Sequence, residues 1–368
     1  MSQGRATRRR GVGHRMALRR SISVAAALAA ASVALAACAP APESGGGGSA
    51  SDACVRMVTN SGGLEDRSFN QSSWEGLQQA EDEYGIDAEA IVSTGETDLA
   101  PNVAQAVESG CELIVTVGWE LAESTLDQAG KNPELAFAIV DETVEADNVK
   151  PVVFDTAQAS YLAGYLAAGV SKTGVVATFG GGNQPPVTLF MDGFVDGVAK
   201  YNEVHGAQVR VLGWNKEAQD GTFTGDFEDI SKGKTLTQAF IDQGADVILP
   251  VAGQVGEGAA AAASENSGVS VIWVDSDGYE VLPAEFRGYV LTSVLKNTQD
   301  AMVEIVGDVL DGDFDAEPFV GTLENGGVAI APYHDLAPLV SPGLDGELEG
   351  LRQAIIAGEI VVESPSRP

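Results

Sequence analysis

The sequence predicts an α/β protein made of two lobes, each a doubly wound parallel sheet with helices on both faces. Short apolar runs alternate strictly with segments of helical pattern, which is typical of parallel sheets. The runs are continuously apolar, as expected of strands buried on both faces. The alternation restarts near the middle of the chain, and about 315 globular residues are too many for one ordinary core, so two lobes are expected.

The first series of elements begins just after Cys54. The expected strands are residues 55–59, 88–93, 113–117 and 136–140, and the expected helices are residues 69–84, 99–109 and 121–128. Ser68 and Gln71 stand three residues apart at the start of the first helix and predict a capping box. Residues 152–155, which follow Pro151, are expected to form a crossing segment.

The second series begins with a helix. The expected helices are residues 161–171, 189–201, 232–243, 256–266 and 298–311, and the expected strands are residues 174–179, 208–214, 247–250, 269–274 and 290–295. Ligands of such sheets bind outside the carboxyl ends of the strands. In a two-lobed protein those edges line the cleft between the lobes.

The N-terminal segment is typical of a lipoprotein signal peptide. Residues 1–20 hold seven arginines and no acid, residues 21–37 are small and apolar, and Leu35-Ala-Ala-Cys38 follows. We therefore expect residues 1–37 to be removed and Cys38 to receive a lipid. An uncleaved N-terminal anchor is the alternative, and the adjacent arginines at positions 19 and 20 leave the export route open. Residues 38–53, rich in Gly, Ser and Pro, are expected to be a flexible linker.

The charge and the remaining cysteines restrict the partners and the compartment. The net charge is −32, and it becomes −39 without the seven arginines of the signal peptide, which makes nucleic-acid binding very unfavourable. Cys54 and Cys111 each stand directly before a predicted strand. If those strands are parallel neighbours, both cysteines lie at one edge of the sheet, and an exported protein would join them in a disulfide. Two buried free thiols are the alternative.

Residues that follow the predicted strands form the candidate ligand site. They supply carboxylates, an amine, an amide, large rings and glycines that allow a close approach of backbone. The set is Asp66, Phe69, Asn70, Trp119, Asp141, Phe190, Gly253, Asp275 and Lys296. Rings stack on a flat heterocycle, and an acid with an amine holds a diol, so the set favours a nucleoside.

Each of these residues also has a purely structural interpretation. Asp66, Asp141 and Asp275 are candidates for turn or helix-capping acids, and Lys296 for a surface lysine at a strand end. The rings of Phe69, Trp119 and Phe190 are equally candidates for the core. Their coincidence on one edge favours the ligand site.

Catalysis, metal binding and cofactor binding have little support. His205 and His334 lack cysteine or histidine partners at ligand spacing, so no metal site is expected. No nucleophile elbow or Walker loop appears. The loop after residue 179, "GGGNQPP", has no Lys or Arg nearby, so a phosphorylated ligand is disfavoured.

Several segments together resemble one known family. They are "EDRSFNQSSWEGL", "FAIVD", "ASYLAGYLAA", "FGGGNQPPVTLFMDGFVDGV", "GADVILPVAGQVGEGA", "VIWVDSDGY" and "VLTSVLKN", in this order. They resemble the basic membrane lipoprotein family, the PnrA-like substrate-binding proteins of ABC transporters. The resemblance covers about residues 54–363. It implies the type I periplasmic-binding-protein fold and, from characterised members, a purine nucleoside as ligand.

The resemblance also implies a role for each candidate residue. Asp66 and Asn70 would line the first-lobe wall with Phe69 near the base, Asp141 would hydrogen-bond the base, and Phe190 would stack on it. Trp119 is a further candidate ring at the site. Gly253, Asp275 and Lys296 would hold the ribose hydroxyls.

The architecture that follows is a lipid-anchored receptor on the outer face of the cytoplasmic membrane. We expect a first lobe of residues 54–156 and 297–316, a second of residues 157–296 and 317–368, and hinge strands near residues 154–156, 275–278 and 296–297. The expected partners are a nucleoside and the permease and ATPase subunits of an ABC importer, with the receptor a monomer and not an enzyme. A sugar or riboflavin-like ligand, a signalling receptor and a surface nucleoside hydrolase are the alternatives.

Overall fold

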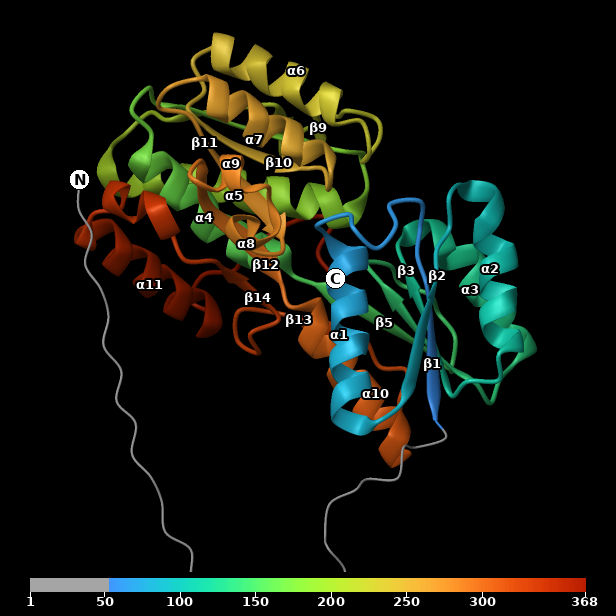
Figure 1. Ribbon diagram of the computed structural model, residues 1–368. Helices are drawn as coiled ribbons and strands as arrows, with labels where there is room; N and C mark the ends of the chain where they lie inside the picture. Colours follow the sequence, from blue (N-terminus) through green and yellow to red (C-terminus); the bar gives the residue numbers. More distant parts are fainter. Residues whose placement is uncertain (1–52) are drawn as a thin grey trace, which may run out of the picture. The chain divides into compact units, whose positions relative to one another are not determined.

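Two six-stranded sheets organise the protein, as the computed structural model of residues 53–368 shows (Figure 1). The expected signal peptide (1–37), the lipidation site Cys38 and the linker up to residue 52 lie outside the described residues. The predicted α/β class with two parallel-dominated sheets is confirmed. The architecture is the type I periplasmic-binding fold.

The first sheet has the order β13–β5–β4–β3–β1–β2, and every neighbouring pair is parallel. Its strands are β1 (Cys54–Val58), β2 (Asp87–Ile91), β3 (Leu113–Val117), β4 (Ala136–Val140), β5 (Val149–Phe154) and β13 (Phe319–Gly321). The first lobe is this sheet with the helices that cover it.

The second sheet has the order β14–β12–β11–β10–β6–β7, and only β14 runs antiparallel to its neighbour. Its strands are β6 (Val175–Gly180), β7 (Arg210–Leu212), β10 (Val247–Val251), β11 (Ser270–Asp275), β12 (Val290–Lys296) and β14 (Val328–Ile330). The second lobe is this sheet with its helices and a small hairpin of β8 (Trp214–Asn215) and β9 (Asp220–Gly221).

Helices cover both faces of the first sheet. Helices α1 (Phe69–Tyr84) and α10 (Thr298–Asp311) pack side by side on one face, and α2 (Glu96–Glu108) and α3 (Ala122–Lys131) cover the other (Figure 1). The alternation along β1 explains this, because Met57 belongs to the core under α1 and α10 whereas Val58 belongs to the core under α2 and α3. Both residues are fully buried.

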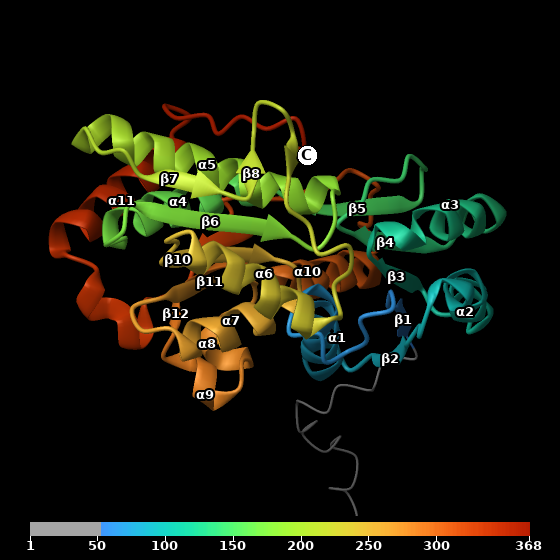
Figure 2. The ribbon, with the colours of Figure 1, turned by 90° about the horizontal axis from the view of Figure 1, so that it is seen from above.

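The second sheet is covered in the same way (Figure 2). Its helices are α4 (Thr156–Val170), α5 (Pro185–His205) and α11 (Pro342–Ile356) on one side, α6 (Ile230–Asp242) and α7 (Val255–Glu265) on the other, and the short α8 (Gly278–Val281) and α9 (Ala284–Arg287). A helix η2 (His334–Leu339) precedes α11. Val176 and Ala177 of β6 are fully buried in the two different cores, so this strand is buried on both faces.

Helices α4 and α5 pack with their backbones very close together. A Cβ atom on Gly197 would lie 1.9 Å from the Tyr161 carbonyl oxygen, and one on Gly164 would lie 2.1 Å from the Phe194 carbonyl oxygen. The glycines therefore permit the close approach. Helix α4 is buried on nearly every side because α5, α11 and the sheet all pack against it.

The chain passes between the two sheets three times, at residues 154–156, 296–298 and 321–328. The crossing expected at residues 275–278 is wrong, because β11 before it and α8 after it both belong to the second lobe. Residues 152–154 are the end of strand β5, and the chain then leads into the first of these crossings, close to where the crossing segment was expected. Strand β13 pairs with β5, so residues 319–321 lie in the first sheet although the expected lobe boundary precedes them.

Two other local expectations are wrong. The strand expected at residues 208–214 ends at Leu212, because Gly213 has a φ of 90°. The Cα of Gly213 also lies against the Thr178 carbonyl oxygen, which would be 2.0 Å from a Cβ atom at this position. The capping box at α1 does not form, because Ser68 makes no side-chain capping bond. The Gln71 side chain instead accepts a hydrogen bond from the Arg67 backbone N–H.

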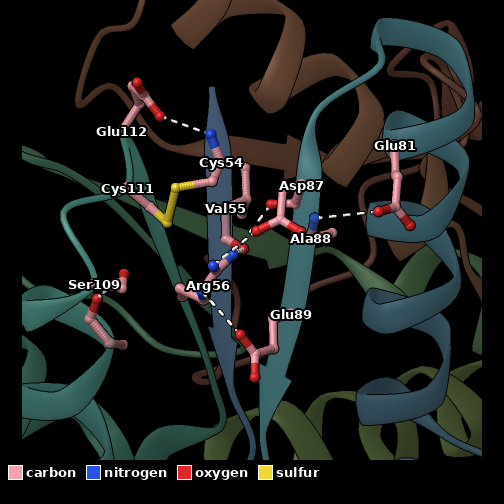
Figure 3. The surroundings of a disulfide bond; sticks show 11 residues. Cys54, Val55, Arg56, Glu81, Asp87, Ala88, Glu89, Ser109, Cys111 and Glu112 are labelled. Carbon is pink, nitrogen blue, oxygen red and sulfur yellow. Dashed lines mark hydrogen bonds and ion pairs between the residues drawn. A yellow bond between two sulfur atoms is a disulfide. The ribbon is translucent and has the colours of Figure 1, made fainter. Parts of the chain in front are cut away.

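A disulfide joins Cys54 and Cys111 at the amino ends of β1 and β3 (Figure 3). The two strands are parallel neighbours in which Val55 pairs with Leu113. This register places the two cysteines side by side, with their Cα atoms 4.8 Å apart. The Cys54 backbone N–H also donates to Glu112 Oε2 at 2.8 Å. The disulfide lies at the edge of the sheet opposite to the carboxyl ends of its strands.

Candidate ligand-binding site

Four strand ends that face the cleft carry residues with positive φ. Asp141 follows β4 with a φ of 63°, and Asp275 ends β11 with a φ of 67°. Gly118 after β3 and Gly253 after β10 also have positive φ. Aspartates in this conformation are uncommon, and strained backbone of this kind concentrates at functional sites. The two lobes thus present the same pattern, a glycine and then an aspartate at adjacent strand ends.

Lys296, the last residue of β12, links the two aspartates. Its Nζ lies 2.5 Å from Asp141 Oδ2 and 3.4 Å from Asp275 Oδ1. All three side chains are almost completely buried. Burial opposes the charged ammonium, but the two carboxylates outweigh it and hold the pKa of Lys296 above its usual value. Burial at the same time raises the pKa of Asp141. The cluster therefore places one amine and two carboxyl groups almost out of contact with solvent.

Three phenylalanine rings surround the Lys296 ammonium. The ring centroids of Phe190, Phe154 and Phe69 lie 5.5, 5.9 and 6.0 Å from Nζ. At these distances the rings attract a cation. Phe69 is half-buried at the start of α1 in the first lobe, whereas Phe190 is buried on α5 in the second. Rings from both lobes therefore flank the charged cluster.

A cavity at this point brings most of the predicted residues together. It is lined by Phe69, Trp119, Asp141, Phe190, Gly253, Asp275 and Lys296. Trp119 lies at its mouth and keeps 44% of its surface exposed. Its ring is thus open to solvent in this conformation, unlike that of Phe190.

Asp66 and Asn70 lie in an adjoining chamber instead. The Asp66 carboxylate accepts hydrogen bonds from the backbone N–H groups of Ser68, Asn70 and Gln71 and from the Asn70 side chain. It therefore caps α1. Burial raises the pKa of Asp66 to about 6, although these four donors favour the charged form.

Sequence reasoning missed several residues that line the cavity. They are Asn60, Ser68, Glu120, Gln184, Pro186 and Phe227. Ser68 was predicted to cap α1, yet its hydroxyl donates to Asp275 Oδ2 across the cleft. Gln184 belongs to the glycine-rich loop and Glu120 follows Trp119, so their positions after strands were the available signal. Phe227 lies in a long irregular segment that gives no such signal.

The loop before α1 contacts the second lobe at further points. The Arg67 guanidinium forms an ion pair with Glu257 of α7. The Trp273 indole N–H donates to the Arg67 carbonyl oxygen at 3.4 Å. Together with the bond between Ser68 and Asp275, these contacts hold the two lobes against each other around the cavity.

The chemistry of the cavity favours binding over reaction. Buried carboxylates accept O–H or N–H donors, the ammonium donates to hydroxyl oxygens, and rings cover a flat ligand. Residues 53–368 contain no group of three or more His, Cys, Asp or Glu side chains that could hold a metal ion. The geometry is that of a mainly apolar small-molecule site with a few convergent polar groups.

The model of one protein family, "ABC transporter substrate-binding protein PnrA-like", matches residues 53–366. The chain belongs to this family. It is therefore a substrate-binding protein of an ABC transporter. Such a protein is located outside the cytoplasm at the membrane, where it binds a small ligand and works with a permease. This family role is that of a binding protein rather than an enzyme. Within residues 53–368, no helix is both long and apolar enough to span a bilayer.

Relatives and solved structures agree with the PnrA-like assignment. The chain is 32% identical to a CD4+ T-cell-stimulating antigen of Listeria monocytogenes, over 87% of this chain and 90% of that protein. It is 31% identical to the ABC transporter nucleoside-binding protein BmpA of Lactococcus lactis, over 85% and 90% of the two chains. A solute-binding protein of an ABC transporter system from Aeropyrum pernix superposes with a TM-score of 0.75 at 25% identity, over 85% and 94% of the two chains.

Proposed function

We propose that this PnrA-like protein is a lipid-anchored receptor that binds a purine nucleoside between its lobes and delivers it to an ABC importer. The observation that carries the proposal is the buried cluster of Asp141, Asp275 and Lys296 flanked by Phe69 and Phe190. It combines groups that hold a diol with rings that stack on a base. A relative named for nucleoside binding supports the same ligand class.

The ribose hydroxyls would bind at the charged cluster. A vicinal diol offers two O–H donors and oxygens that accept, which matches carboxylates on either side of an ammonium. The ammonium would move from Asp141 toward the hydroxyl oxygens, leaving the Asp141 carboxylate to accept from the base. Gly253 lines the cavity and has no side chain, so its backbone would approach the ribose closely.

The base would stack on Phe190, with Phe69 on its other side. Stacking contributes about 1–3 kcal/mol per base. A free sugar would lose this contribution, which separates the nucleoside proposal from a sugar receptor.

Ligand exchange would follow from opening at the three crossings at residues 154–156, 296–298 and 321–328. The contacts of Arg67 and Ser68 with the second lobe would break as the cleft opens. Cys38, if lipidated, would tether the receptor through the linker of residues 38–53, and a monomer suffices for this role.

A thermal-shift screen tests the proposal. The purified protein is heated with purine and pyrimidine nucleosides, free bases, sugars and riboflavin, and turnover of each nucleoside is checked by chromatography. A purine nucleoside at a hundredfold excess over Kd is expected to add about 2.7 kcal/mol to the free energy of unfolding.

Two variants control the screen. Asp141→Ala is expected to abolish the shift, and Asp315→Ala, which removes an acid paired with Lys150 outside the cavity, is expected to retain it. A shift with sugars or riboflavin only would contradict the nucleoside, and turnover of the nucleoside would contradict the role of receptor.

A further inference from the structure

A chain of hydrogen bonds beside the cavity leaves two acceptors unused. Asn70 Nδ2 donates to Asp66 Oδ2 at 2.9 Å and to Asn60 Oδ1 at 2.7 Å. Asn60 Nδ2 donates in turn to Glu120 Oε1 at 3.3 Å. These bonds determine the orientation of both amides, because the nitrogen of each faces an oxygen acceptor. Asn70 Oδ1 and Glu120 Oε2 are buried and have no partner among the described residues.

Unpartnered buried oxygens of this kind require an explanation. A buried acceptor without a donor costs about 1–3 kcal/mol. Asn70 is fully buried, and burial raises the pKa of the Glu120 carboxyl above its usual value. Both residues line the chamber that adjoins the cavity, and Glu120 lines the cavity itself. A bound ligand is the available source of donors.

The chamber also selects by charge. It is lined by the acids Asp66, Glu96, Glu120, Asp226 and Glu228, and none of its lining residues, all within the described part of the chain, is a lysine or arginine. A phosphate group would be repelled, and an N–H group would be attracted.

We propose that Glu120, held by Asn60 and assisted by Asn70, reads the base edge in addition to the contact of Asp141 with the base, and that it selects a base with adjacent N–H donors. The inference rests on the proposed nucleoside function and deepens it. Among purine nucleosides, guanosine offers such a pair, its ring N1–H and its 2-amino group. Inosine has the same ring system and the N1–H but lacks the amino group. The receptor therefore prefers guanosine to inosine, because only guanosine satisfies both acceptors.

Glu120→Gln replaces the acceptor Oε2 by an N–H donor without changing the size of the side chain. Asn60 Nδ2 continues to donate to the amide oxygen, so the new amide nitrogen occupies the position of Oε2. It then presents an N–H to the N–H of guanosine. Glu96→Gln is the matched control, because Glu96 lines the same chamber but is exposed at the start of α2.

Titration calorimetry of the purified protein with guanosine, inosine and guanosine monophosphate tests the inference. The wild-type protein and Glu96→Gln are expected to bind guanosine at least tenfold more tightly than inosine, and the monophosphate weakly. In Glu120→Gln the ratio is expected to fall to about one, mainly through loss of guanosine affinity. The comparison in the wild-type protein needs no variant, and unfolding curves without ligand check that Glu120→Gln folds.

The outcomes separate the two proposals. Equal affinity of the wild-type protein for guanosine and inosine, or an equal loss of both in Glu120→Gln, overturns the role of Glu120 and leaves the nucleoside receptor standing. Absence of binding by every nucleoside overturns the receptor proposal and this inference with it.

Discussion

Lys296 Nζ donates to Asp141 Oδ2 at 2.5 Å, and this bond joins the end of β12 in the second sheet to the residue after β4 in the first. Asp275 lies on the other side of the same ammonium. A buried ion pair contributes little to stability by itself, because desolvation offsets the attraction. At its position between the lobes, the pair connects the first sheet to the second.

Removal of the ammonium is expected to destabilise the protein strongly. In Lys296→Met, Asp141 and Asp275 become buried carboxylates without a cation, which costs about 3–5 kcal/mol at neutral pH. Denaturant unfolding at pH 7 measures the loss. Lys150→Met is the control, because the partner of Lys150, Asp315, is largely exposed. A Lys296→Met protein as stable as the wild type would contradict the coupled cluster.

The disulfide is expected to stabilise the first lobe without influencing the site. It closes a loop of 57 residues, for which the chain-entropy relation gives about 4 kcal/mol. The double variant Cys54→Ala with Cys111→Ala should lose stability of this order in chemical denaturation, with unchanged ligand affinity. A change in affinity together with unchanged stability would show that the disulfide acts on the cleft instead.

Close packing of α4 on α5 predicts intolerance to a single methyl group. Gly197→Ala places a Cβ atom against the Tyr161 carbonyl oxygen, and overpacking of this kind costs about 1–3 kcal/mol. Gly130→Ala in α3 meets no atom within 4 Å and should stabilise by about 1 kcal/mol. Thermal unfolding of the two variants should therefore shift in opposite directions. Equal shifts of the unfolding temperature in the two variants would mean that α4 and α5 move apart at no cost in free energy.

Most of the fold was predictable because short apolar strands alternate with helices. Strands β13 and β14 were not predicted, since each is too short to show a periodic pattern. Gly213 packs against the carbonyl oxygen of Thr178, a residue distant in sequence, and the segment after Gly213 folds back as a hairpin. Tertiary contacts of this type are invisible to local patterns.

The position of the candidate site was predictable where it follows directly from topology. Asp141, Asp275 and Lys296 stand at strand ends, and parallel strands bring their carboxyl ends to one edge. The partner of Ser68 was not predictable, because a serine before a helix favours a cap locally, whereas here Asp66 caps the helix and frees the hydroxyl for Asp275. The bond between Ser68 and Asp275 depends on the proximity of the two lobes in space, which local sequence patterns do not show.

Burial of Asp66 predicts a pH dependence of stability. Its pKa is raised from 3.8 to about 6 in the folded protein, so the stability that it contributes is present below pH 3.8 and is lost as the pH rises through 6. The free energy of unfolding of the wild type minus that of Asp66→Asn should fall by about 3 kcal/mol between pH 3.5 and 7. Carbon NMR of the Asp66 carboxyl group should show a midpoint near pH 6. A midpoint near 3.8 would mean that the capping donors outweigh burial.

Equilibrium binding of purine nucleosides, measured by titration calorimetry against free purine bases and ribose, tests the central claim most directly. We expect one nucleoside molecule to bind per protein, with ribose and the free bases at least a hundredfold weaker because each occupies half of the site. Phe190→Ala should weaken nucleoside binding by about 1–3 kcal/mol, and Asp141→Ala should abolish it. No binding of any purine nucleoside, or full affinity in Asp141→Ala, would contradict a nucleoside site at the Asp141–Lys296 cluster.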